Sequence, residues 1–141
     1  MSMSFSVGRH STLRHLLWAF CLTVCPLTLA QHGHPLVGNW SGNWTSGSNQ
    51  GRLLVLIEFN ADQVISGSII EGSVRAPITE ATLNPDGWGV TLKGQQKDAS
   101  GAIVDVEISG VIESIGSITE RAIVGTWRKS GASSNLRLTL N

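Results

Sequence analysis

Few side chains in this sequence could perform chemistry, and one pair of carboxylates has a suggestive spacing. Asp105 and Glu107 are two residues apart in an alternating segment, so they would share one strand face and could pair. A catalytic pair needs a cleft that drives the two pKa values apart. Because Asp105 and Glu107 alternate with Val104 and Val106, we expect them to face water instead.

Histidine is scarce as well. Beyond residue 30 the only histidines are His32 and His34, close to the predicted start of the mature chain. Together with a free amine at Gln31 they could form a small copper or nickel site, since imidazoles suit these metals. The alternative is a flexible tail without metal, and cyclisation of Gln31 would remove the amine. No other residues suggest a metal site.

The sequence beyond residue 30 contains few of the residues that covalent catalysis or cofactor binding would need. Both cysteines, Cys21 and Cys25, lie within the first thirty residues, and the chain has no tyrosine. A Ser-His-Asp arrangement would have to use a histidine from the tail. The glycines are scattered and do not form a phosphate-binding pattern. We therefore expect no catalytic residues, no cofactor and no enzymatic activity.

The first thirty residues have the pattern of a secretory signal peptide. Arg9 and Arg14 precede an apolar run, LLWAFCLTVCPLTLA, over residues 16–30, and Thr28 and Ala30 are small residues at the positions that a signal peptidase reads. The pattern predicts cleavage near Ala30 and export to the periplasm or the medium. The alternative is a lipoprotein, because LTVC over 22–25 resembles a lipobox with Cys25 as the anchored residue.

Removal of this leader changes the charge and the redox chemistry. The chain has ten basic and ten acidic residues, and loss of Arg9 and Arg14 would leave a net charge of about −2. That balance gives no reason to expect nucleic acid as a partner. The mature chain would contain no disulfide and no transmembrane span, so packing and strand pairing must stabilise it.

After a short tail over residues 31–35, apolar residues alternate with polar ones and turn residues recur. This period of two predicts one all-β domain over residues 36–141. The predicted strands cover residues 36–45, 52–60, 63–71, 74–83, 88–97, 102–112, 121–129 and 135–140, with Pro77 favouring an edge or a bulge. Turns are predicted at 84–87 and 98–101. Eight strands with short connections favour an antiparallel up-and-down barrel, and a two-sheet sandwich is the alternative.

In the stretch GNWSGNW over residues 38–44, glycine and tryptophan alternate on one strand face. Gly38, Trp40, Gly42 and Trp44 point one way, which lets two indoles fit inside a narrow barrel. We expect Trp40 to be structural, since small barrels are filled by their own side chains. Trp44, Trp88 and Trp127 are candidates for lining an apolar ligand pocket.

Several segments together resemble the calycin group, and the expected mature length resembles that of the avidins more closely than that of the longer lipocalins. They are GNWTSGSNQGRLLVLIEFNADQVISGSI over 42–69, GWGVTLK over 87–93, ISG over 108–110 and IVGTWRKSG over 123–131. The order of these motifs resembles the order of the avidin strands. The resemblance implies an eight-stranded barrel and a ligand site inside it.

The avidin biotin site is carried over only in part. Trp127 and Ser48 stay in register with the family's ligand-binding residues, whereas Ser46, Ile69, Leu92 and Ile108 replace polar or aromatic ones. We therefore expect biotin binding to be absent or very weak, because the ureido group needs convergent hydrogen bonds. In the lipocalin-like pattern an arginine from the last strands crosses the first-strand tryptophan, and Arg128 or Arg137 could do so.

These observations predict an exported, non-enzymatic barrel that binds a small, largely apolar molecule. The alternative is an interaction protein, such as an inhibitor of a secreted hydrolase, that uses its loops or tail while the barrel is solid. Leu54 and Leu56 make the second strand apolar on both faces, which favours a homo-oligomer that covers the outer face.

Overall fold

The computed structural model of the protein describes residues 33–60 and 64–141. The predicted signal peptide, the lipobox at Cys25, and Gln31 and His32 lie outside the described residues. The predictions that depend on them remain predictions.

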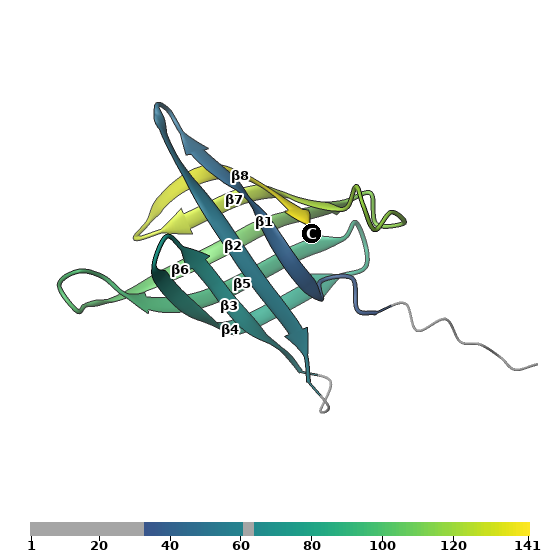
Figure 1. The fold of residues 1–141 in the computed structure, drawn as a ribbon, viewed down its shortest axis with the longest axis horizontal. Helices are drawn as coiled ribbons and strands as arrows, with labels where there is room; N and C mark the ends of the chain where they lie inside the picture. Colours follow the sequence, from purple (N-terminus) through teal and green to yellow (C-terminus); the bar gives the residue numbers. More distant parts are fainter. Residues whose placement is uncertain (1–32, 61–63) are drawn as a thin grey trace, which may run out of the picture. The chain divides into compact units, whose positions relative to one another are not determined.

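Eight antiparallel strands form a closed barrel in which each strand pairs with the next and β8 returns to β1 (Figure 1). The strands are β1 (Gly38–Ser46), β2 (Asn49–Phe59), β3 (Ile65–Glu71), β4 (Val74–Asn84), β5 (Gly89–Lys97), β6 (Ile103–Glu113), β7 (Ala122–Lys129) and β8 (Ala132–Leu140). This confirms the predicted all-β up-and-down barrel over the sandwich. Across the described residues, no helix has the length and apolar character needed to span a membrane.

The barrel interior is filled by the apolar face of each strand. Alternate residues of β2, for example Leu53, Val55 and Ile57, are buried, and their neighbours are more exposed. Every strand contributes to the same core, because closure turns all the inward faces toward one axis. The largest fully buried side chain is Trp40.

Two predicted details of the connections are confirmed. The pairing between β4 and β5 shifts register between Ile78 and Glu80, close to Pro77, so the disturbance is a bulge rather than an edge. The turn before β6 is held by Asp98, whose carboxylate accepts hydrogen bonds from the Ser100 hydroxyl and the Ala102 amide at 2.6 Å and 3.0 Å. The Ser100 hydrogen bond is the main reason that the pKa of Asp98 lies below its ordinary value.

At one end of the barrel, called here the closed end, Leu36 from the segment before β1 and Ile115 from the loop 114–121 pack against the core. Leu36 was predicted to begin the first strand, but it lies in a turn before β1 and is fully buried. Its carbonyl accepts a 2.7 Å hydrogen bond from the Trp40 indole N–H. Arg121 donates to the carbonyls of Pro35 and Ile115 at 3.2 Å and 2.8 Å, which joins the two covering segments.

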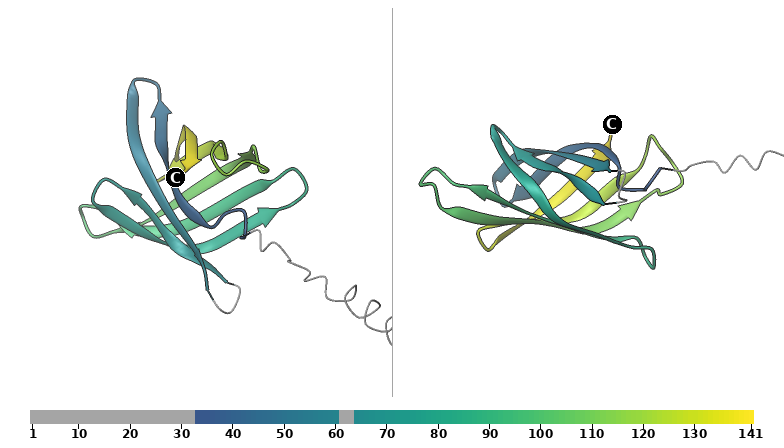
Figure 2. Two further views of the ribbon diagram at one scale, coloured as in Figure 1. Left: turned by 45° about the vertical axis from the view of Figure 1, so that its right-hand side comes forward. Right: turned by 90° about the horizontal axis from the view of Figure 1, so that it is seen from below.

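The opposite end, called here the mouth, carries the turns between β1 and β2, β3 and β4, β5 and β6, and β7 and β8. The hairpin of β5 and β6 extends past its neighbours, since residues 95–97 and 103–105 pair only with each other (Figure 1). Figure 2 shows the same arrangement from two further directions.

Trp88 differs from its predicted position at the start of a strand. It ends the turn that precedes β5, with a left-handed backbone at φ 56°, directly after Gly87 at φ 79°. Its carbonyl accepts a 2.9 Å hydrogen bond from the Ile112 amide, and its ring packs half-buried against the core. This turn lies at the closed end.

Candidate functional site

Trp44 is the last inward-facing tryptophan of β1, four residues beyond Trp40 and at the mouth. Its β2 partner is Gly51, and a Cβ atom built on Gly51 would lie 2.5 Å from the indole nitrogen of Trp44. The ring therefore lies directly on the backbone of β2, in space that only glycine leaves free. Gly51 fixes the position of the indole at the rim of the mouth.

Glu71 and Lys129 form an ion pair at the same end. Glu71 follows Ile69 by two residues on β3, and Lys129 follows Trp127 by two residues on β7, so both continue the inward faces of their strands. The Lys129 ammonium lies 2.6 Å from Glu71 Oε2, and the Trp44 indole N–H donates to Glu71 Oε1 at 3.0 Å. Trp44, Glu71 and Lys129 thus form one connected polar cluster.

A cavity of about 300 Å³ opens at the mouth. It is lined by Trp44, Glu71, Trp127, Lys129, Ser130, Ala132 and Ser134, and we call it the mouth cavity. Below it the barrel is filled by Trp40 and the other core side chains. The mouth cavity is therefore a recess at one end and not a channel through the barrel.

The predicted ligand-binding residues do not all converge. Trp44 and Trp127 both line the mouth cavity, whereas Trp88 lies at the closed end. Ser48 is exposed in the turn between β1 and β2 and is not among the cavity residues. Glu71 and Lys129 were not predicted as site residues, although their two-residue spacing from Ile69 and Trp127 already indicated inward positions.

The arginine predicted to cross Trp40 is neither Arg128 nor Arg137. Both point outward with more than half of the side chain exposed, Arg128 near Glu107 at 3.8 Å and Arg137 near Glu113 at 2.9 Å. The arginine at the closed end is Arg121, which precedes β7 and binds the segment next to Leu36. The sequence alone did not distinguish a loop arginine from two strand arginines.

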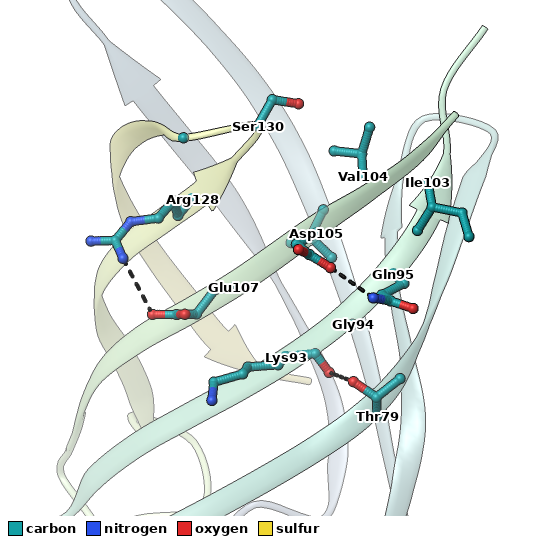
Figure 3. Close-up of a pocket in the computed structure, with 12 residues that line it drawn as sticks. Thr79, Lys93, Gly94, Gln95, Ile103, Val104, Asp105, Glu107, Arg128 and Ser130 are labelled. Carbon is teal, nitrogen blue, oxygen red and sulfur yellow. Dashed lines mark hydrogen bonds and ion pairs between the residues drawn. The ribbon is translucent and has the colours of Figure 1, made fainter. Parts of the chain in front are cut away.

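A second, larger hollow of about 660 Å³ lies on the outside of the barrel across β4 to β7 (Figure 3). We call it the outer hollow. Its side chains include Thr79, Lys93, Gln95, Ile103, Asp105, Glu107, Arg128 and Ser130. Most of its charged groups already have partners: Gln95 donates to Asp105 at 2.8 Å, and Lys93 pairs with Glu80 at 3.0 Å.

The outer hollow also contains the carboxylate pair considered from the sequence. Asp105 and Glu107 share the outer face of β6, and each faces a different neighbour, Gln95 and Arg128 respectively (Figure 3). Their exposure fits the interpretation that they face water.

The described part of the predicted tail packs against the barrel. The His34 ring stacks on Phe59 with centroids 5.3 Å apart, and its Nδ1 lies 3.4 Å from the Leu36 amide that donates to it. Burial lowers the pKa of His34. Within residues 33–60 and 64–141, no group of three or more His, Cys, Asp or Glu side chains is arranged to hold a metal ion.

The lowered pKa of His34 predicts a small loss of stability in mild acid. Between the ordinary histidine pKa and the lower folded pKa, the unfolded chain binds a proton that the folded chain does not. The free energy of unfolding therefore keeps its full His34 contribution above the ordinary histidine pKa, and it falls as the pH drops toward the folded pKa. Urea unfolding at pH 7.5 and pH 5.0 measures the loss. His34→Phe, which keeps a ring for Phe59, should show a smaller loss, and an equal loss would contradict this assignment.

Comparisons with models of protein families, with curated proteins and with solved structures found no match to this chain. The barrel itself is compatible with a calycin-like fold, since eight antiparallel strands close in sequence order.

Proposed function

We propose that this barrel is a non-enzymatic binding protein that takes one small, largely apolar molecule in the mouth cavity. The observation that carries the proposal is a recess of about 300 Å³ between two tryptophans in a barrel that is otherwise filled. Pockets for small ligands have mostly apolar walls with a few polar groups that fix orientation. Trp44 and Trp127 supply the wall, and Glu71 and Lys129 supply the polar groups.

The volume limits the size of the ligand. A cavity near 300 Å³ is at the lower end of the range of ligand pockets, which suits a molecule of one or two fused rings. Indoles stack on flat rings in offset or edge-to-face geometry. We therefore expect a flat ring system rather than a long alkyl chain, which would have to displace the core.

The proposal is tested by following each indole N–H in ¹H–¹⁵N spectra during titration with 2-naphthol. The Trp44 and Trp127 signals should shift because they line the mouth cavity, and the Trp40 and Trp88 signals should not. Trp44→Phe should weaken binding by about tenfold, since one indole edge and its hydrogen bond to Glu71 are lost. Trp88→Phe is the matched control and should bind normally. Shifts centred on Trp88 would contradict the proposal.

A second candidate is an interaction protein that contacts a partner through the outer hollow. The observation in its favour is Ile103, which is 67% exposed in the extended β5–β6 hairpin and lines the outer hollow. Protein interfaces commonly have a polar rim around an apolar centre. Ile103→Asp should abolish capture of such a partner and leave binding of 2-naphthol unchanged.

Export is part of the proposal and rests on the sequence pattern of residues 1–30. Mass spectrometry of the protein from its own host would show a new N-terminus near Gln31. A lipid adduct on Cys25 would favour the lipoprotein alternative.

A further inference from the structure

Some hydrogen-bonding groups in the mouth cavity already have partners within the protein, and others have donors to spare. Glu71 is the only carboxylate among the lining side chains, and each of its oxygens accepts one hydrogen bond, from Trp44 and from Lys129. The Lys129 ammonium has three N–H donors, and one of them donates to Glu71. The Lys129 side chain is 37% exposed and that of Glu71 is 19% exposed, so the accessible charge is the cation.

Trp127 provides a second unused donor. Its residue is 3% exposed, and its indole N–H makes no hydrogen bond to any described residue. Among the described side chains, the only fully buried nitrogen or oxygen without a partner is Arg121 Nε. The Trp127 N–H therefore reaches accessible space, and Trp127 lines the mouth cavity. The free groups of the lining side chains are thus an ammonium, an indole N–H and the hydroxyls of Ser130 and Ser134.

We propose that the mouth cavity selects a flat, ring-containing carboxylate, with the ring between Trp44 and Trp127 and the carboxylate at Lys129 Nζ. This inference rests on the proposed binding function and names its ligand class. A carboxylate only accepts hydrogen bonds, so it complements the free donors of Lys129 and Trp127. A ligand ammonium would face the Lys129 cation and would have to compete with it for Glu71.

The test uses three probes with the same ring: 2-naphthoate, 2-naphthamide and 2-(aminomethyl)naphthalene as its cation. Affinities measured by calorimetry at low salt should fall in that order, with about a tenfold or larger gap between the carboxylate and the cation. Lys129→Met keeps the apolar stem and should reduce the preference for naphthoate over naphthamide to near unity. Lys93→Met, on the outer face of β5, is the control and should keep the preference.

A second variant, Glu71→Gln, tests the same inference in case Lys129→Met does not fold. Glu71→Gln retains an oxygen for the Trp44 N–H and removes the negative charge next to Lys129, so naphthoate should bind about threefold or more tightly than to the unchanged protein. Equal binding of all three probes, or tighter binding of the cation, would overturn the ligand class and leave the binding function intact. If none of the probes binds, both the proposed function and this inference are wrong.

Discussion

Trp40→Ala should lower the free energy of unfolding by about 3–5 kcal/mol, the cost typical of deleting a buried tryptophan. The ring has no exposed surface and is the largest side chain of the core. Removing it also loses the 2.7 Å hydrogen bond that ties Leu36 and the closed end to β1. Because small domains are stable by about 5–15 kcal/mol, the loss is a large share of the total. Urea unfolding at pH 7.5 measures it.

Two matched variants separate the contributions. Trp40→Phe keeps most of the ring volume and leaves the Leu36 carbonyl without its donor, so it should cost about 1–3 kcal/mol. Trp44→Ala, on the same strand face, should cost less than Trp40→Ala because Trp44 is only partly buried. A larger loss at Trp44 than at Trp40 would show that the core lies at the mouth and not below it.

Gly42→Ala should be nearly as damaging, although it adds a single carbon. A Cβ atom on Gly42 would overlap the carbonyl oxygen of Arg137 and would lie 2.9 Å from the Cα of Leu138. Both are backbone atoms of β8, which cannot move without breaking the ladder that closes the barrel. We expect a loss near the upper end of overpacking costs, about 3 kcal/mol, measured as a lower midpoint in thermal and urea unfolding.

Gly116→Ala is the control for this prediction. Gly116 lies in the loop 114–121, and a Cβ there would have no heavy atom within 4 Å. The variant should unfold within about 0.5 kcal/mol of the unchanged protein, as surface substitutions usually do. If Gly42→Ala were equally mild, β1 and β8 would not approach as closely as described.

Much of the fold was predictable because alternation and turn chemistry are local signals. The inward faces of the second and sixth predicted strands, such as Leu53 with Val55 and Val106 with Ile108, are buried as expected. Boundaries were less predictable where the backbone leaves the alternation. The sequence placed Leu36 and Trp88 at the starts of strands, but Leu36 lies in a covering turn and Trp88 has a left-handed backbone. Neither conformation has a signal in residue type alone.

The candidate site was predictable only in half. Alternate residues of a strand face the same side, so Trp44 and Trp127 are expected inside a barrel, and so are Glu71 and Lys129. This alternation does not show which inward residues lie at the same end of the barrel, because that depends on the stagger with which the barrel closes. For this reason Trp88 and Trp127 looked equivalent in the sequence and lie at opposite ends of the structure. The pairing of Glu71 with Lys129, 58 residues apart, has no local signal.

That ion pair also has a mechanical consequence. Along the closed sheet, β3 and β7 are four strands apart in either direction, so the 2.6 Å contact between Glu71 and Lys129 spans the rim from one side to the other. Backbone ladders join only strands that are neighbours in the barrel. The Glu71–Lys129 contact therefore ties together two opposite strands at the mouth that share no backbone ladder.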